Sequence, residues 1–194
     1  GAHLVNQLLT LARAEPSAAA AQDGVALDLT RLVRELTAEL VPRALQAGID
    51  LGIGLGDEDE HGEAPPVAPL WVSGNPLLLR EALVNLIDNA LRYAGRGAVV
   101  TVRLRAAPAE PAARRGPRVV VEVEDDGPGI GDADPERLFQ RFVRGTHEGD
   151  GCGLGLPIVR EIVERHHGEV QLERRQPHGL RVRVVLPQRR APGA

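Results

Sequence analysis

The chain of 194 residues contains no lysine, no methionine and a single cysteine, and aromatic residues make up only 2% of it. All 23 basic residues are therefore arginine, and the formal net charge of −4 argues against a general nucleic-acid binder. A lone cysteine, Cys152, excludes an intrachain disulfide and fits a reducing compartment. No apolar run approaches the roughly 20 residues of a membrane-spanning helix, and we find no signal peptide.

The hydrophobic residues, 43% of the chain, suffice for an aliphatic core, and their periodicity predicts both helices and strands. Helical spacing of leucine, isoleucine and valine predicts four helices, over residues 3–14, 28–46, 75–95 and 157–167. Alternating apolar residues predict strands over residues 49–55, 71–72, 100–104, 119–123, 170–173 and 180–186. We expect an α+β fold, a two-layer α/β sandwich with a mostly antiparallel mixed sheet and helices on one face.

The helix that begins at Asn75-Pro76 is predicted to carry a polar face with an unusual composition. With 100° per residue, Asn89 lies about 40° to one side of Asn85, and Arg92 about 20° to the other. Glu81 and Tyr93 fall on the same face. A solvated surface would explain any one of these side chains, but asparagine lowers helix propensity and prefers caps. A carboxamide oxygen suits Mg²⁺, and an arginine one turn later can bind a phosphate.

Two glycine-rich segments follow, each of which could approach a ligand. The first, Asp125-Asp126-Gly127-Pro128-Gly129-Ile130, comes directly after a predicted strand, where a carboxylate can accept a hydrogen bond from an exocyclic amine such as that of adenine. A plain Asp-Gly turn is the alternative explanation. The second, from Gly149 to Leu156, leads into a helix that starts at Pro157, an arrangement that can bind an anion. It lacks the Gly-Lys-Ser/Thr of a Walker loop.

The only two phenylalanines, Phe139 and Phe142, lie between these glycine-rich segments. In a region otherwise rich in glycine and aspartate, they are predicted to pin a lid against the domain. Arg141 and Arg144 in the same stretch either face phosphate or are simply solvated.

Taken together, these motifs resemble those of sensor histidine kinases. Asn85–Asn89 with Arg92-Tyr93 resembles the N box, Asp125–Gly129 the first glycine box, Phe139–Phe142 the F box and Gly151–Gly155 the second glycine box. Their order and spacing agree with the family across residues 75–168. The resemblance implies the Bergerat ATP-binding fold of the GHKL superfamily, which gyrase-type ATPases share.

The resemblance also implies roles for individual residues. Asn89 would coordinate Mg²⁺, with Asn85 beside it facing the phosphates of ATP. Arg92 would contact phosphate, Tyr93 would stack near the adenine, and Asp125 would accept a hydrogen bond from its amino group. Further nucleotide contacts would come from Gly127, Gly129, Ile130, Gly151, Gly153, Leu154, Gly155 and Leu156. The candidate catalytic residues are Asn85, Arg92, Arg141 and Arg144.

Three positions depart from the common family pattern. Arg92 stands where many relatives have lysine, Asp126 where asparagine is common, and Asn75 where aspartate is frequent. None of these departures removes an expected ligand.

Residues 3–14 resemble the end of the second helix of the dimerisation domain. We therefore expect residues 1–24 to be a remnant of that domain and a linker, residues 25–190 the catalytic domain, and residues 191–194 a tail. The phosphoacceptor histidine would lie upstream, so the 194-residue chain should bind ATP without autophosphorylating. Expected partners are ATP or ADP, the dimerisation and histidine-phosphotransfer domain, and the receiver domain of a response regulator, with no nucleic acid or membrane contact. The parent is expected to be a homodimer anchored in the bacterial inner membrane, with this domain in the cytoplasm.

Other functions stay open at this point. A gyrase-type hydrolase would need a water-activating glutamate where Asn85 stands, and Glu81 is the only local substitute. A serine kinase of the anti-sigma type would not need the helix at residues 3–14, and a docking module without ATP binding would not need Asn89 and Asp125. The histidines offer no metal-site spacing: His3, His61, His147 and His178 are isolated, and His166-His167 suits a helix C-terminus.

Overall fold

The structure, a computed structural model, describes residues 24–55, 68–132, 134–139 and 155–193. The predicted helix over residues 3–14 lies outside these ranges. In chain order, the elements are β1 (Ala26–Asp28), α3 (Leu29–Ala47), β2 (Asp50–Leu55), β3 (Trp71–Ser73), α4 (Pro76–Tyr93), β4 (Val99–Ala107), η1 (Pro111–Ala113), β5 (Arg118–Asp125), η2 (Pro135–Phe139), α5 (Gly155–Arg165), β6 (Glu169–Arg174) and β7 (Leu180–Pro187).

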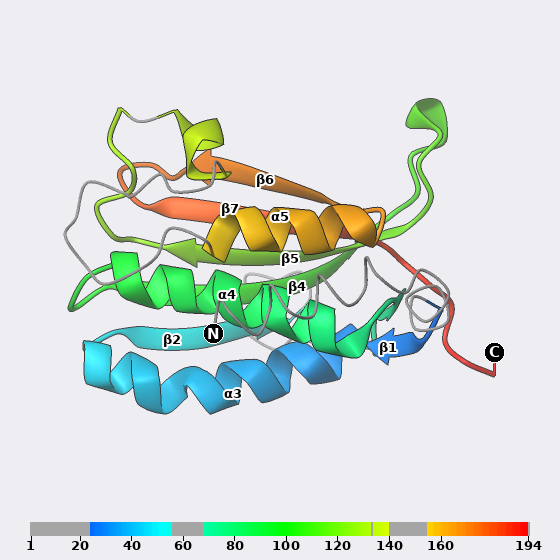
Figure 1. Cartoon of the computed structure of the whole chain (residues 1–194), viewed down its shortest axis with the longest axis horizontal. Helices are drawn as coiled ribbons and strands as arrows, with labels where there is room; N and C mark the ends of the chain where they lie inside the picture. Colours follow the sequence, from blue (N-terminus) through cyan, green and yellow to red (C-terminus); the bar gives the residue numbers. More distant parts are fainter. Residues whose placement is uncertain (1–23, 56–67, 133, 140–154, 194) are drawn as a thin grey trace, which may run out of the picture.

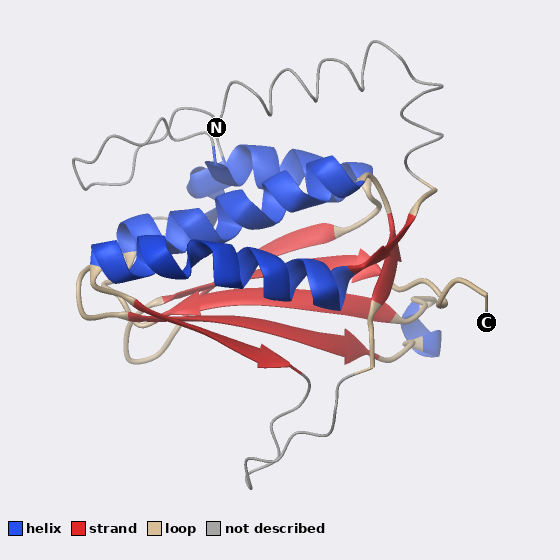
Figure 2. Ribbon diagram, turned by 90° about the horizontal axis from the view of Figure 1, so that it is seen from below, coloured by secondary structure: helices blue, strands red, loops and turns tan. Residues whose placement is uncertain are grey.

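Five strands form a mixed sheet in the order β2-β4-β5-β7-β6. Strand β2 pairs parallel with β4, and the other neighbours pair antiparallel. Strands β1 and β3 form a separate antiparallel pair. The three helices cover one face of the large sheet, and its other face carries no helix among the described residues (Figures 1 and 2). The prediction of an α+β two-layer sandwich is confirmed. The short strand β1 was not predicted.

The core lies between the helices and the sheet. The predicted apolar stripe of α4 is buried there and consists of Leu79, Leu83, Leu86, Ile87 and Ala90. Alternate residues of the central strand β5, namely Val119, Val121 and Val123, are buried as well. Because α4 packs its apolar stripe onto the sheet, its opposite face, which carries Asn85 and Asn89, points away from the core.

Two side-chain caps fix where α3 and α4 begin. Asp28 accepts a hydrogen bond from the amide of Arg31 at 3.0 Å. Asn75 accepts from the amides of Leu77 and Leu78 at 3.0 and 3.3 Å, and Pro76 follows at the first helical position. Asparagine at position 75 is therefore a helix cap, which explains why aspartate there is not required.

The end of α5 differs in detail from the prediction. The helix ends at Arg165 and not at His167, and His167 adopts a left-handed conformation with φ 60°. A Cβ on Gly168 would lie 2.4 Å from the carbonyl oxygen of Val185. Glycine is needed there because β7 passes so close to the chain.

The open face of the sheet is covered by ion pairs instead of a helix. Glu122 and Glu124 of β5 are only 6% and 5% exposed, although both are acidic. Arginines of the neighbouring strands surround them: Arg103 and Arg181 lie 2.9 Å from Glu124, and Arg183 lies 2.8 Å from Glu122. Burial by itself would raise the pKa of Glu124, but the hydrogen bonds from Arg103 and Arg181 and the charge of Arg175 lower it overall.

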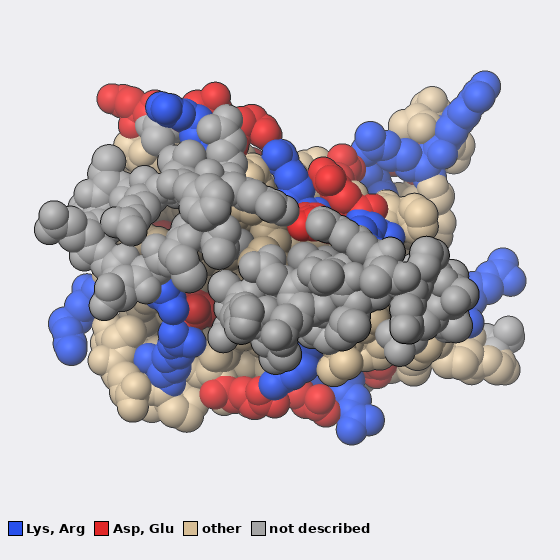
Figure 3. Space-filling view, in the orientation of Figure 1, with Lys and Arg blue, Asp and Glu red and all other residues tan. Residues whose placement is uncertain are grey.

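Beyond the sheet, the hairpin between β4 and β5 projects from the body of the molecule, and arginine side chains stand out from it in the space-filling view (Figures 1 and 3). The two strands are longer than the predicted ranges 100–104 and 119–123, because β4 continues to Ala107 and β5 begins at Arg118. Within the described residues, we find no helix whose length and hydropathy would suit a bilayer.

Candidate functional site

The polar face of α4 carries the two asparagines that the sequence singled out. Asn85 and Asn89 are both half-buried and lie one helical turn apart. The side-chain amide of Asn85 donates to the carbonyl oxygen of Glu81 at 2.8 Å. A Cβ on Gly155, the first residue of α5, would lie 3.9 Å from Asn85 Oδ1. The middle of α4 and the N-terminus of α5 therefore meet at Asn85.

One turn further along α4, Arg92 is held by a carboxylate. Its Nε lies 3.1 Å from Asp88 Oδ2, and the same carboxylate lies 2.7 Å from Nη1 of Arg43 on α3. The side chain of Asp88 is only 16% exposed, whereas those of both arginines are nearly half exposed. Arg92 is thus positioned by an ion pair with Asp88 one turn before it, and Asp88 is shared with Arg43, which lies 45 residues before Asp88 in the chain.

Asp125, at the end of β5, is the buried carboxylate of the site, with 7% of its surface exposed. Its Oδ1 accepts a hydrogen bond from the amide of Gly127 at 2.9 Å, and the amide of Leu180 also bonds to the carboxyl group. Burial raises the pKa of Asp125 above the usual value for an aspartate, and these two amides only partly offset that effect. A carboxylate has acceptor capacity beyond two amides, so Asp125 can still receive a donor from a ligand.

The segment Asp125–Gly129, which we call the Asp125 loop, rests on the C-terminal end of α4. A Cβ on Gly127 would lie 2.5 Å from the carbonyl oxygen of Ala94. Asp126 bonds to β4, since its Oδ1 accepts from the amide of Val99 at 2.7 Å. Tyr93, 37% exposed, directly precedes Ala94. Gly127 is therefore needed for a close approach, and the Asp125 loop lies next to the tyrosine predicted to stack on adenine.

The turn between β6 and β7 supports the Asp125 loop from another side. Arg175 Nη1 donates to the carbonyl oxygen of Asp125 at 2.8 Å, and His178 Nδ1 lies 3.1 Å from that of Gly127. Sequence reasoning missed Arg175 and treated His178 as isolated. The adjacent dipeptide His178-Gly179 was the only hint of a tight turn, and it did not show what the turn packs against.

Phe139, the F-box residue that the structure describes, is anchored to α5. Phe139 is buried, and the guanidinium of Arg160 lies 4.0 Å from the centre of its ring. Arg160 also bonds to both carboxylate oxygens of Glu136, at 3.1 and 3.0 Å. These contacts fasten η2 onto α5, as the prediction of a phenylalanine anchor requires.

Several predicted site residues cannot be placed in this geometry. Arg141, Arg144, Gly151, Gly153 and Leu154 lie outside the described residues, as do Phe142 and Cys152. Gly129 and Ile130 are half-buried in and beside the Asp125 loop. Leu156 is buried in the core, so any contact it makes with a nucleotide must come from its backbone.

The residues present fit an adenine nucleotide better than a metal bound by protein alone. Among the described residues there is no group of three or more histidine, cysteine, aspartate or glutamate side chains that could hold a metal ion. Mg²⁺ usually keeps several waters and takes one or two protein oxygens together with substrate phosphates. The half-buried carboxamides of Asn85 and Asn89 match that requirement, and Asp125 with its glycines matches an exocyclic amine.

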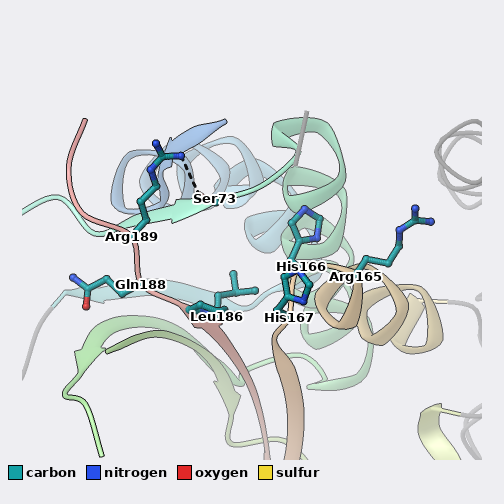
Figure 4. Close-up of a pocket in the computed structure, with 8 residues that line it drawn as sticks. Ser73, Arg165, His166, His167, Leu186, Gln188 and Arg189 are labelled. Atoms are coloured by element: carbon teal, nitrogen blue, oxygen red, sulfur yellow. Dashed lines mark hydrogen bonds between the residues drawn. The ribbon is translucent and has the colours of Figure 1, made fainter. Parts of the chain in front are cut away.

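A small pocket of about 140 Å³ lies at the other end of α5, away from Gly155 (Figure 4). His166 Nε2 accepts from the amide of Asn75 at 3.0 Å, and its Nδ1 lies 2.7 Å from the carbonyl oxygen of Ile162. Arg189 Nη1 donates to Ser73 and to the carbonyl oxygen of Gly24. These polar groups join α5 to the start of α4, and the C-terminal segment to β3 and to Gly24, so the pocket is a junction of the fold.

Comparison with known proteins agrees with this geometry. Residues 74–190 match the family described as "Histidine kinase-, DNA gyrase B-, and HSP90-like ATPase". The chain belongs to this family. Sensor protein kinase PmrB of Pseudomonas aeruginosa is 34% identical to it over 187 residues, which cover 95% of this chain and 35% of PmrB. Sensor-like histidine kinase SenX3 of Mycobacterium tuberculosis is 36% identical over 135 residues, 68% of this chain and 30% of SenX3.

Solved structures give the same result for the fold. Mycobacterial sensor histidine kinase MprB superimposes with a TM-score of 0.67 at 26% identity, covering 87% of this chain and 99% of that one. ShkA, solved full-length in complex with AMPPNP, gives a TM-score of 0.66 at 26% identity and covers 98% of this chain and 37% of that one. The chain is the catalytic, ATP-binding domain of a two-component sensor histidine kinase. It spans about a third of the length of the curated relatives.

Proposed function

We propose that this domain binds MgATP along the polar face of α4 and transfers the γ-phosphoryl group to a histidine of a dimerisation domain. The observation that carries this proposal is the course of α4, which meets the Asp125 loop at Ala94 and the start of α5 beside Asn85. Nine residues of helix separate these two positions, about 13 Å along the axis. A nucleoside triphosphate can span them with its base at one position and its phosphates near the other.

The Asp125 loop would bind the base. The carboxylate of Asp125 accepts a hydrogen bond from the exocyclic amine of adenine, in a buried position where a hydrogen bond to a charged group counts for more than it does in water. Gly127 and Gly129 allow the backbone to pass close to the base, and Tyr93 stacks beside it. The AMPPNP complex of ShkA supports an adenine nucleotide as the ligand of this fold.

The phosphates would lie near Asn85, Asn89 and the N-terminus of α5. When bound, Mg²⁺ would neutralise triphosphate charge, with the carboxamide oxygen of Asn89 as its protein ligand and Asn85 facing the phosphates. The first amides of α5, beginning at Gly155, point towards an anion at this end of the helix. Arg92 can reach a phosphate if it leaves Asp88, and Arg141 and Arg144 remain candidates for γ-phosphate contact.

Transfer rather than hydrolysis follows from the side chain at position 85. A carboxamide cannot act as a general base for water, and the amide of Asn85 is already bonded to the backbone of Glu81. The positioned triphosphate therefore needs a nucleophile from another domain. Phosphoryl transfer of this kind depends mainly on positioning and charge neutralisation, which the site can provide.

The domain boundaries and partners belong to the same proposal. Residues 1–24 would continue a dimerisation helix and its linker, residues 25–190 would form the catalytic domain, and residues 191–194 a tail. The acceptor histidine and then an aspartate on the receiver domain of a response regulator would be the successive phosphoryl acceptors. The parent would be a homodimeric kinase of the bacterial inner membrane, with this domain on the cytoplasmic side. The relatives, which are sensor kinases about three times as long, support this organisation.

Two measurements test the proposal. Calorimetric titration with ATP and ADP, with and without Mg²⁺, should show adenine-nucleotide binding that Mg²⁺ strengthens for ATP. Incubation with [γ-³²P]ATP should label an added dimerisation domain on its acceptor histidine, and should leave the 194-residue chain itself unlabelled. Binding of ATP without any transfer to the histidine would contradict the kinase role. Rapid ATP hydrolysis that is lost in Glu81→Gln would favour a gyrase-type hydrolase instead.

A further inference from the structure

The turn between β6 and β7 touches the Asp125 loop although about 50 residues separate them in the chain. We propose that Arg175 and His178 of this turn are positioning residues for the carboxylate of Asp125, and that the selectivity of the domain for adenine depends on them. This inference rests on the proposed nucleotide site. It concerns two residues that lie behind the loop and do not themselves contact the base.

The two side chains act on successive parts of the loop backbone. Arg175 Nη1 donates to the carbonyl oxygen of Asp125 at 2.8 Å, and His178 Nδ1 lies 3.1 Å from the carbonyl oxygen of Gly127. The peptide units between these carbonyls include the Gly127 amide, which holds Asp125 Oδ1. Glycine loses more conformational freedom on ordering than any other residue, so a glycine loop needs such external restraints. Fixing the two carbonyls fixes the carboxylate.

The turn between β6 and β7 packs closely against the Asp125 loop. A Cβ on Gly179 would lie 2.1 Å from the carbonyl oxygen of Asp125, and a Cβ on Gly129 would lie 3.2 Å from that of Gly179. The turn is closed by its own hydrogen bond, from the amide of Arg175 to Gly179 at 3.0 Å. The β6–β7 turn and the Asp125 loop therefore contact each other through their backbones, and the two side chains tie them together.

The contact of Arg175 with the Asp125 loop can be tested separately from the ion pairs on the open face of the sheet. Its Nε lies 3.7 Å from Glu124, which Arg103 and Arg181 hold more closely, at 2.9 Å each. Arg181 makes the same kind of ion pair with Glu124, and the bonds found for it go to glutamates and not to the Asp125 loop. Substituting Arg181 therefore disturbs the ion pairs while leaving the loop contacts in place, which makes it a matched control.

Selectivity between adenine and hypoxanthine reports on the position of the carboxylate. Adenine carries an amino group where hypoxanthine carries a carbonyl oxygen. A carboxylate held in place accepts a hydrogen bond from the former and repels the latter, whereas a displaced carboxylate does neither well. A general loss of folded protein would instead weaken ATP and ITP equally.

The test is the ratio of ATP to ITP affinity, measured by calorimetry on the 194-residue chain and its variants. In Arg175→Ala, we expect ATP to bind about tenfold more weakly while ITP changes less than about twofold, the effect of one misplaced hydrogen bond to a charged group. His178→Ala should lower the ratio about threefold for the same reason. Arg181→Ala should leave the ratio unchanged, and thermal unfolding of each variant reports whether it is folded.

The inference is overturned if Arg175→Ala and His178→Ala keep the wild-type ratio, or if both nucleotides weaken equally in folded variants. It is also overturned if Arg181→Ala lowers the ratio as much as Arg175→Ala does. If Arg175→Ala does not fold, His178→Ala decides alone. If the wild-type chain binds neither ATP nor ITP, the proposed function itself is overturned. If the wild-type chain binds ATP and both variants keep its ratio of ATP to ITP affinity, only the inference about Arg175 and His178 is overturned.

Discussion

The Asp125 loop and the polar face of α4 contribute to the same candidate site in different ways. Polar groups of the loop are bonded to backbone atoms: the buried Asp125 to the amides of Gly127 and Leu180, and the half-buried Asp126 to Val99. On α4, the side chains are half-buried or exposed, and Arg92 is paired with Asp88. The loop is therefore preorganised for a base, whereas the α4 face must exchange at least one existing interaction when phosphates bind.

The contrast between the Asp125 loop and α4 predicts which contacts contribute most to ATP affinity and which can be adjusted by a competing ion pair. A preorganised contact loses little entropy on binding, so its removal should cost the most affinity. A contact that must first break an ion pair contributes less, and its strength can be tuned by the partner that competes for it. Substitutions in the Asp125 loop should therefore weaken ATP binding more than substitutions on the polar face of α4.

Asp125→Asn should weaken ATP binding about 50- to 100-fold, because the replacement loses a charged acceptor in a buried position. The folded state should not suffer in parallel. Since the folded-state pKa of Asp125 is raised, its contribution to stability is present below the ordinary carboxyl pKa and is lost as the pH rises through the raised value. At neutral pH, the melting temperature of Asp125→Asn should therefore equal or exceed that of the wild type. A variant that binds ATP normally would contradict the role of Asp125.

Asn89→Ala should weaken MgATP binding about tenfold, because a protein ligand of the ion is lost. Binding of ATP in the presence of a chelator should change far less, since the asparagine acts through the metal. Calorimetry in Mg²⁺ and in EDTA measures both. Arg80→Ala, on the same helix but paired with Glu39 of α3, is the control and should bind MgATP as the wild type does. Equal losses with and without Mg²⁺ would rule out a metal-specific role.

Sequence reasoning predicted the architecture because the periodicity of apolar residues survives in the three-dimensional packing. The stripe of α4 and the alternating valines of β4 and β5 are buried as expected. The same rule failed for the opposite face of β5. Glu122 and Glu124 alternate with valines as solvated residues would, yet they are buried. Their burial depends on arginines of β4 and β7, and strand pairing cannot be read from either strand alone.

The candidate site also contains residues that the sequence indicated and residues that it did not. Asn85 and Asn89 were singled out because asparagine is unusual in a helix interior, and Asp125 because it follows a strand and precedes a glycine-rich segment. Arg175 and His178 were missed because they bind backbone carbonyl oxygens. Every residue has such an oxygen, so the sequence does not indicate which one a side chain binds. The pair formed by Asp88 and Arg43 was missed for a different reason, since it depends on how α3 packs against α4.

The ratio of ATP to ITP affinity should depend on pH. This change should be smaller than the losses of affinity in Asp125→Asn and Asn89→Ala. As the pH falls through the raised pKa of Asp125, the carboxylate gains a proton and loses acceptor capacity, so ATP affinity should fall relative to ITP. The two nucleotides carry the same phosphates, so their affinity ratio removes the titration of the phosphates from the comparison. The decline should begin at a higher pH than an exposed aspartate would give. A ratio that is constant with pH in the wild type would contradict an ionised acceptor.

The smallest expected effect concerns the ion pair that holds Arg92. Asp88→Asn removes the carboxylate that competes with phosphate, so MgATP should bind about threefold more tightly. Loss of the pair with Arg43 should lower the free energy of unfolding by about 0.5–1 kcal/mol, because both arginines are nearly half exposed. Arg43→Gln lowers stability through the same helix contact but leaves Asp88 with Arg92, so it should not tighten binding. If Asp88→Asn still binds more tightly in an Arg92→Ala background, the gain comes from removing the charge of Asp88 and not from freeing Arg92.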